Sequence, residues 1–171
     1  MPDKVRWGVI GSGGIARRRT IPEGIHPASN AVLAAVYDID AQVNREMAAR
    51  FGAVAAASID ELLAAGVDAV YIATPVDVHC QQAVAAAAAG KHVFCEKPMG
   101  MNVAEAERMT AAARQAGVKF GTAFMMRFLA QHQAALKLIR EGRLGKPVYA
   151  RAQLSCWYPP MAGAWRQQLS R

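Results

Sequence analysis

A run of glycines near the amino terminus, Gly11-Ser12-Gly13-Gly14-Ile15-Ala16, has the spacing G-x-G-x-x-A. The first glycine permits a tight turn, the second lets a pyrophosphate approach the backbone, and the small third residue lets a helix pack closely on a strand. Amides at the start of the following helix then face the phosphates, and the helix dipole favours their negative charge. The spacing therefore predicts a dinucleotide-binding turn with these contact residues: Gly11, Ser12, Gly13, Gly14 and Ile15.

An acidic residue, Asp38, follows a second apolar run at residues 31–37. A carboxylate at this place accepts hydrogen bonds from the hydroxyls of the adenosine ribose and repels a 2′-phosphate. Ile39, expected to line the same ribose site, stands where enzymes that use NADP often have arginine or serine. These residues favour NAD as the cofactor. NADP stays an alternative, because one of the arginines in Arg17-Arg18-Arg19 can reach a 2′-phosphate unless all three form a solvated helix face.

A second chemical motif, Cys95-Glu96-Lys97-Pro98, follows a short strand predicted at residues 92–95. Ligands of open α/β sheets bind beyond the carboxyl ends of the strands, so we expect Lys97 at the nicotinamide end of the cleft. Pro98 keeps Lys97 out of helical backbone angles and so directs its side chain. A lysine in this place can exchange a proton with a substrate hydroxyl as hydride moves, which makes Lys97 the candidate catalytic residue. The alternative is a surface lysine paired with Glu96.

The segments between these motifs alternate between apolar strands and capped helices. Strands are predicted at residues 5–10, 31–37, 67–73, 92–95 and 118–124. Helices are predicted at residues 41–50 after Asp40, from the capping box Ser58-Ile59-Asp60-Glu61 to Gly66, from Asp77 to Gly90, and from Asn102 to Gly117. Apolar strands separated by crossover helices are typical of a parallel sheet covered on both faces. The predicted fold class is α/β, a doubly wound Rossmann sheet over residues 1–124.

The pattern changes after residue 124. A helix is predicted at residues 129–140 and a strand at residues 148–154, after which Tyr158-Pro159-Pro160 breaks regular structure. A lone strand leaves backbone groups unpaired and apolar side chains uncovered. We therefore expect residues 125–171 to be the beginning of a second domain that this sequence does not complete.

Composition excludes several classes of function. The chain has 171 residues, of which 53% are hydrophobic and 19% charged, and this is typical of a globular protein. No stretch of about 20 apolar residues predicts a membrane span, and the amino terminus does not resemble a signal peptide. Three scattered cysteines argue against a disulfide scaffold and favour a cytoplasmic location. No cluster has the spacing of metal ligands, so no metal is expected.

Positive charge is concentrated toward the carboxyl terminus. Residues 1–110 contain 10 basic and 12 acidic side chains, whereas residues 111–171 contain 10 basic and one acidic side chain. The basic residues of the second segment are spread singly among apolar ones, and no nucleic-acid-binding motif occurs. We expect no nucleic-acid partner; a tail that binds nucleic acid is the weakest alternative.

Six features of the sequence occur together. They are the glycine turn, Asp38, Ile72-Ala73-Thr74-Pro75, His79, the run AGKHVFCEKP at residues 89–98 and the run LIREGRLGKP at residues 138–147. This combination resembles the family of glucose–fructose oxidoreductase and inositol dehydrogenase over essentially the whole chain. The resemblance implies a Rossmann domain followed by an open-faced α/β domain. It also implies NAD(P)-dependent oxidation or reduction of a sugar, a polyol or a related small molecule, and we expect a homo-oligomer.

The resemblance also implies roles for particular residues. Lys97 matches the motif lysine near the nicotinamide and the substrate. Contacts with the cofactor are implied for the residues Ala73, Thr74, Pro75, His79, Glu96, Lys97, Arg127, Trp165 and Arg166.

The chain departs from the family in its length. Family chains run to about twice this length, as two domains require. After the Trp-Arg pair they carry a glycine-rich stretch and an Asp…His motif that complete the substrate site, and this sequence stops before them. The alternative function is therefore a dinucleotide-binding module without catalysis, acting as a sensor or an assembly subunit.

Overall fold

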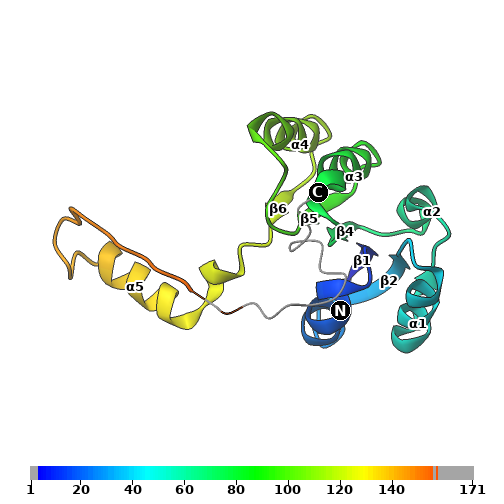
Figure 1. Ribbon diagram of the computed structural model, residues 1–171, viewed down its shortest axis with the longest axis horizontal. Coiled ribbons are helices and arrows are strands. Elements are labelled where there is room, and N and C mark those ends of the chain that lie inside the picture. Colours follow the sequence, from blue (N-terminus) through cyan, green and yellow to red (C-terminus); the bar gives the residue numbers. More distant parts are fainter. Residues whose placement is uncertain (1–3, 156, 158–171) are drawn as a thin grey trace. The chain divides into compact units, whose positions relative to one another are not determined.

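The chain divides into two compact units, residues 1–125 and 126–171, in a computed structural model that describes residues 4–155 and 157. The first unit is a parallel sheet flanked by helices, and the second contains the helix α5 (Figure 1). Among the described residues, no helix is long and apolar enough to cross a membrane.

Six parallel strands form one sheet in the order β3-β2-β1-β4-β5-β6. The strands are β1 Val5–Ile10, β2 Ala31–Tyr37, β3 Val54–Ala55, β4 Ala69–Ile72, β5 His92–Cys95 and β6 Phe120–Thr122. The chain extends from β1 to β3 on one side, then crosses to the other side of β1 and continues with β4. Ligands of open α/β sheets bind where the order reverses in this way, here between β1 and β4. The topology confirms the doubly wound parallel sheet predicted from the sequence.

The register of the strands places the predicted site residues in one row. Ile10 pairs with both Tyr37 and Ile72, and Ile72 pairs with Cys95. Each of these four residues ends its strand, so the residues that follow them lie side by side along the carboxyl edge of the sheet. Gly11, Asp38, Ala73 and Glu96 are those residues.

Helices connect the strands and begin where the sequence offers a capping side chain. They are η1 Ala16–Ile25, α1 Ala41–Phe51, α2 Ile59–Ala64, α3 Val76–Ala88 and α4 Val103–Gln115. Asp40 caps α1, Ser58 caps α2 and Asn102 caps α4, each by accepting hydrogen bonds from amides of the first turn. These three caps confirm the predicted helix starts.

Some predicted boundaries are wrong. Helix α3 begins at Val76 after Pro75 and not after Asp77, because the fixed φ of proline suits the entry to a helix and no side-chain cap is needed there. The strands predicted at residues 67–73 and 118–124 are shorter in the structure, since only their central residues pair with neighbouring strands. The two-residue strand β3 was not predicted, because so short a segment has no periodicity to detect.

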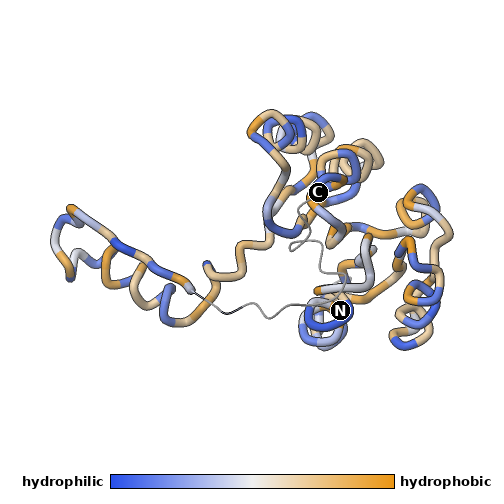
Figure 2. The backbone as a smooth tube through the Cα atoms, viewed as in Figure 1, coloured by the Kyte–Doolittle hydropathy of each residue, from blue (hydrophilic) through white to orange (hydrophobic). Residues whose placement is uncertain are grey.

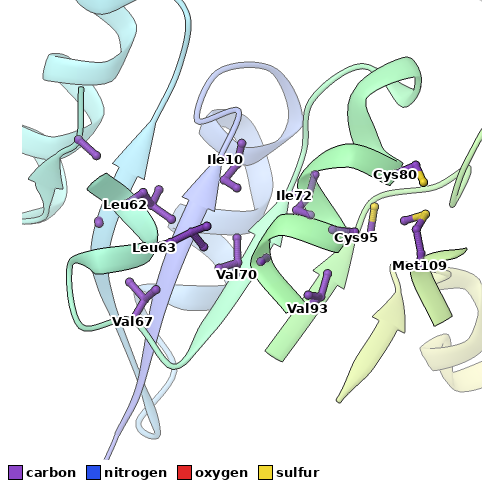
Figure 3. Packing of buried hydrophobic residues seen from close by; sticks show 14 residues of the cluster. Ile10, Leu62, Leu63, Val67, Val70, Ile72, Cys80, Val93, Cys95 and Met109 are labelled. Atoms are coloured by element: carbon purple, nitrogen blue, oxygen red, sulfur yellow. The ribbon is translucent and has the colours of Figure 1, made fainter. Parts of the chain in front are cut away.

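Two hydrophobic clusters pack on opposite faces of the sheet. Ile10, Val70 and Ile72 face a cluster with residues of α2, α3 and α4 (Figure 3). Val9, Val36 and Tyr71 face the other cluster, with residues of η1 and α1. Neighbours along one strand therefore enter different cores, which explains why the central strands β2 and β4 contain no charged residue; Figure 2 shows the hydropathy along the chain.

The second unit contains one predicted helix and lacks one predicted strand. Helix α5 spans Ala130–Arg140, close to the predicted 129–140, and it follows the 3-10 helix η2, Met125–Phe128. The strand predicted at residues 148–154 is wrong: these residues are exposed and form no strand. A strand is stabilised by backbone hydrogen bonds to a neighbour, and the described residues of this unit provide none. The predictions for Tyr158-Pro159-Pro160, Trp165 and Arg166 lie outside the described residues.

Candidate cofactor and proton-transfer site

The glycine turn is held against the loop that follows β4. Gly11 has a φ of +83°, and a Cβ atom built on it would lie 2.9 Å from backbone atoms of Ala73 and Thr74. The amide of Gly11 donates to the carbonyl oxygen of Tyr37 at 2.8 Å, and the amide of Ala73 donates to that of Ile10 at 2.8 Å. Only glycine fits this place, because a side chain would push the two loops apart.

The Asp38 carboxylate is fixed at the same turn. Its Oδ2 accepts a hydrogen bond from the Gly13 amide at 2.8 Å, and its Oδ1 accepts one from the Asp40 amide at 3.0 Å. Each carboxylate oxygen has a further lone pair with which it can accept a hydrogen bond from a ribose hydroxyl. A 2′-phosphate at this place would meet the negative charge directly. Ile39, the next residue, is almost fully exposed and offers no positive charge to offset it.

The remaining residues of the turn differ in exposure. Ser12 is fully buried and its hydroxyl oxygen has no hydrogen-bond partner among the described residues, so the side chain faces the protein. Gly14 is exposed, with a φ of +39° and no atom within 4 Å of a built Cβ. Ile15 is the residue before helix η1. The turn therefore has an open side next to the first amides of η1, which is the place where a pyrophosphate fits.

The three arginines after the turn all have partners within the first unit. Arg17 pairs with Glu46 of α1 at 3.3 Å, Arg19 pairs with Glu23, and Arg18 donates to the carbonyl oxygen of Gly14 at 3.2 Å. These arginines are exposed, and exposed pairs contribute little energy. Their arrangement is that of a solvated helix face.

His79 lies beneath the loop after β4. The ring is 1% exposed, and its Nε2 lies 2.8 Å from the carbonyl oxygen of Thr74 while its Nδ1 lies 3.0 Å from that of Pro98. The Thr74 hydroxyl donates to Gln82 at 2.6 Å. The histidine thus joins the loop after β4 to the loop after β5 from within the protein.

Glu96 and Lys97 differ strongly in their surroundings. The Glu96 carboxylate accepts from the Tyr71 hydroxyl at 2.7 Å and from the backbone amide of Lys97 at 3.0 Å. The Lys97 side chain is exposed and forms no ion pair with any residue in 4–155 or with residue 157. The alternative for Lys97 was a surface lysine in an ion pair with Glu96. The structure does not show this ion pair, because the Glu96 carboxylate bonds to the Tyr71 hydroxyl and to the backbone amide of Lys97.

The neighbouring cysteine is chemically inert in this environment. Burial, with a contribution from the Glu96 carboxylate, raises the pKa of Cys95 to about 12. The thiol therefore keeps its proton at neutral pH and is a poor nucleophile.

A shallow pocket of about 290 Å³ lies beside the Asp38 end of the row. Its lining includes Tyr37, the residue before Asp38, together with Asp60 at the start of α2 and Val78 and Gln82 on α3. The pocket has both apolar and polar surface next to the carboxyl end of β2.

The other predicted contact residues are less informative. Arg127 is an exposed residue of η2 in the second unit.

The described residues contain no group of three or more histidine, cysteine or acidic side chains that could hold a metal ion. The sequence interpretation missed Tyr71, which donates to Glu96, and Thr20, which donates to Tyr71. A tyrosine inside an otherwise aliphatic strand was the available signal.

The sheet topology, the glycine turn and the fixed Asp38 define a dinucleotide-binding Rossmann domain. Residues 5–124 also match the family model described as an oxidoreductase family with an NAD-binding Rossmann fold. The chain belongs to this family, the Gfo/Idh/MocA oxidoreductases, which confirms the resemblance seen in the sequence.

Two curated relatives are named for reactions on a sugar derivative and on a polyol. The chain is 39% identical over 163 residues to 1,5-anhydro-D-fructose reductase of Ensifer adhaerens, covering 94% of this chain and 48% of the relative. It is 33% identical over 145 residues to myo-inositol 2-dehydrogenase of Thermotoga maritima, covering 84% and 43%. The chain thus spans about half the length of the curated relatives it matches.

Solved structures show the same fold with either nicotinamide cofactor. The WlbA dehydrogenase from Bordetella pertussis, in complex with NADH and UDP-GlcNAcA, matches with a TM-score of 0.78 and 33% identity over 85% of this chain and 42% of that one. A 3-ketoreductase from Actinomadura kijaniata in complex with NADP matches with a TM-score of 0.76 and 32% identity over 84% and 46%. These matches support NAD(P) as the cofactor of the Rossmann domain.

Proposed function

We propose that this protein is an NAD(P)-dependent oxidoreductase that interconverts a hydroxyl and a carbonyl group of a sugar, a polyol or a related small molecule. The observation that carries the proposal is the row at the carboxyl edge of the sheet. Asp38, fixed by the Gly13 amide, stands in the same row as Glu96, and Lys97 follows Glu96. A cofactor site and a proton donor or acceptor are thereby supported on one rigid element.

The residues of the turn would hold the cofactor. Glycine leaves the backbone at Gly11, Gly13 and Gly14 free of side chains, and the first amides of η1 face the place of the pyrophosphate. The Asp38 carboxylate would bind the adenosine ribose and favour NAD over NADP. When bound, the nicotinamide supplies or accepts the hydride.

Lys97 would move the proton that accompanies the hydride. Its ammonium can donate to the oxygen of a carbonyl as that carbonyl is reduced, and its amine can accept the proton of a hydroxyl as that hydroxyl is oxidised. The exposure of Lys97 leaves the side chain accessible to a substrate. The names of the relatives support a sugar or polyol as that substrate.

We also propose that residues 126–171 belong to a substrate and subunit-contact domain, and that the protein is a cytoplasmic homo-oligomer. The exposed apolar side chains of this unit support subunit contacts. Examples are Leu138 and Ile139 of α5.

Two measurements on the same preparation test the proposed reaction. NADH and NADPH are titrated by fluorescence, reduction of NAD and NADP is followed with a panel of sugars and polyols, and oxidation of NADH and NADPH is followed with the corresponding keto sugars. We expect NADH to bind and at least one member of the panel to be oxidised. Cofactor binding without turnover on any sugar or polyol, in either redox direction, would contradict the proposal and favour a module without catalysis.

A further inference from the structure

A buried tyrosine hydroxyl lies between the helix that follows the glycine turn and the motif that contains Lys97. Tyr71 is on strand β4, 1% exposed, within the cluster that includes residues of η1 and α1. Its hydroxyl oxygen lies 3.0 Å from the Thr20 hydroxyl of η1 and 2.7 Å from Oε1 of Glu96. The hydroxyl oxygens of Thr20 and Tyr71 and a carboxylate oxygen of Glu96 thus lie in one hydrogen-bonded group, although they come from three separate segments.

The directions of these hydrogen bonds follow from the chemistry of the groups. Burial raises the pKa of Tyr71 well above its ordinary range, and the Glu96 carboxylate adds to this rise although the Thr20 hydrogen bond opposes it. Tyr71 therefore keeps its single proton. A carboxylate only accepts, so Tyr71 donates to Glu96, and its oxygen accepts from Thr20. The three groups form a chain of donors that ends on the carboxylate.

The other oxygen of the carboxylate connects this chain to Lys97. Oε2 of Glu96 accepts a hydrogen bond from the Lys97 backbone amide at 3.0 Å. The Glu96 amide in turn donates to the carbonyl oxygen of Ile72 at 2.9 Å, which anchors Glu96 to the end of β4. With one oxygen on the Tyr71 hydroxyl and the other on the Lys97 amide, the orientation of the carboxylate is set by both.

We propose that Tyr71 is a positioning residue for Lys97: its hydroxyl orients the Glu96 carboxylate, which fixes the backbone from which the Lys97 side chain projects. Thr20 supports the tyrosine from η1, so the helix expected at the pyrophosphate and the residue expected to transfer the proton share one hydrogen-bonded chain. The proposal rests on the proposed function, in which Lys97 transfers a proton. Tyr71 itself touches neither substrate nor cofactor and acts only through Glu96.

The ring and the hydroxyl of Tyr71 have separable roles. The ring packs against Phe94 with centroids 5.9 Å apart and belongs to the buried cluster, so it stabilises the fold. The hydroxyl alone reaches Glu96 and Thr20. Tyr71→Phe keeps the ring and removes only the hydroxyl, and it is therefore the variant that isolates the positioning role.

Amide hydrogen exchange at Lys97, measured by NMR on the full chain, tests the proposal without turnover. We expect Tyr71→Phe to accelerate exchange at the Lys97 amide about tenfold. The Glu96 carboxylate, which accepts from this amide, loses the Tyr71 hydrogen bond that orients it. Thr20→Val should have a smaller effect, below about threefold, since Tyr71 can still donate to Glu96. Amides in the two buried clusters, such as those of Ala48 and Ala86, should exchange as in the wild type. Tyr149→Phe, which alters an exposed phenol of the second unit, is the matched control.

Kinetics add a second measurement where turnover is found. Tyr71→Phe should lower kcat about tenfold or more, because displacement of a catalytic group costs rate, while the Kd for NADH stays unchanged. Unchanged exchange at Lys97 in Tyr71→Phe would overturn the proposal, and so would a uniform acceleration across the sheet, which would mean that the hydroxyl stabilises only the fold. Failure of the wild type to turn over any sugar or polyol would contradict the proposed function, while the exchange rates would still decide whether Tyr71 positions Lys97.

Discussion

At the scale of single residues, the candidate site depends on two carboxylates that backbone amides hold in place. Asp38 accepts from the amides of Gly13 and Asp40, and Glu96 accepts from that of Lys97. A group that is already ordered loses less conformational freedom when a ligand binds to it. The negative charge of Asp38 and the exposed amine of Lys97 are the two residue-level features whose removal should change function most directly.

The carboxylate charge of Asp38 should determine cofactor preference. In Asp38→Asn one side-chain oxygen remains to accept a hydrogen bond, the other is replaced by a donor NH2 group, and the side chain no longer repels a 2′-phosphate. We expect the preference for NADH over NADPH, measured as a ratio of Kd values, to shrink about tenfold. Asp68→Asn is the control, because Asp68 accepts from the Arg6 amide at the amino edge of the sheet. A wild type that binds NADPH more tightly than NADH would refute this assignment and point to the arginines after the turn.

The amine of Lys97 should matter for rate and little for cofactor affinity. With any substrate that the panel identifies, Lys97→Ala should lower kcat by about 10²–10⁴-fold, the usual contribution of a proton-transfer group. Lys91→Ala is the matched control, because Lys91 directly precedes β5 whereas Lys97 lies beyond its carboxyl end. Steady-state rates together with NADH titrations separate the two effects. Near-normal turnover in Lys97→Ala would show that Lys97 is only a surface residue.

At the scale of elements, the site is formed by loops that follow four neighbouring strands and contact one another. Gly11 lies against the backbone of the loop after β4, and His79 joins that loop to the loop after β5. The strands hold the loop ends in register, while these contacts determine how closely the loops approach. Substitutions at the contacts should therefore change both the stability of the sheet edge and the binding of the cofactor.

The close approach at Gly11 should tolerate no side chain. Gly11→Ala places a Cβ 2.9 Å from the loop backbone at a φ of +83°. We expect a loss of about 2–4 kcal/mol in the free energy of unfolding, with weaker NADH binding. Gly24→Ala is the control, because a Cβ there has no atom within 4 Å, and it should be neutral or slightly stabilising. Urea denaturation of both variants checks the difference; equal stability would contradict the close packing of the two loops.

The bridge made by His79 should stabilise both loops. His79→Leu removes the imidazole, whose neutral form donates one hydrogen bond, to the carbonyl of Thr74 or to that of Pro98, and so leaves one of these carbonyls without its donor. The free energy of unfolding should fall by about 1–3 kcal/mol, and the Kd for NADH should rise. His26→Leu, at an exposed position where the ring packs on Phe51, should lower the free energy of unfolding by less, about 1 kcal/mol or below. If the two leucine variants proved equally stable in urea, the contacts of the His79 ring with the two loops would contribute nothing specific to the free energy of unfolding.

At the scale of the whole molecule, the two units differ in their surfaces. The first unit buries two clusters on the faces of its sheet, whereas the second has exposed apolar side chains on α5 and on the segment after it, including Leu144 and Val148. Contiguous exposed apolar surface marks an interaction site or a tendency to associate. Basic residues are also concentrated in the last 61 residues, which include all of this unit.

The apolar surface of the second unit should make the chain self-associate. We expect sedimentation velocity to show species larger than a monomer, and the double variant Leu138→Lys with Ile139→Lys to shift the distribution toward the monomer. Lys137→Ala, which alters a polar position of the same helix, should leave the distribution unchanged. A monodisperse monomer of the wild type would contradict this prediction and the proposed homo-oligomer.

The sequence by itself determined the class of fold, three of the helix caps, and the residues of the glycine turn and of the Glu96-Lys97-Pro98 motif. Caps are local, since Asp40, Ser58 and Asn102 each bond to amides only two or three residues further along. The glycine turn and Asp38 could also be predicted from the sequence, because each comes directly after an apolar strand. The strand predicted at residues 148–154 failed because pairing depends on a neighbour that no local pattern can supply.

The tertiary structure alone decided which side chains contact one another across strands. Tyr71 and Glu96 are 25 residues apart, and Thr20 is 51 residues from Tyr71, yet the parallel register brings the three hydroxyl and carboxylate groups into one chain. The packing of α3 on the sheet likewise buries His79 between two loops, and the Glu96 carboxylate bonds to the Tyr71 hydroxyl and the Lys97 backbone amide. Such contacts depend on strand order and on the packing of η1 against the sheet, which are global properties that the periodicity of any single segment does not contain.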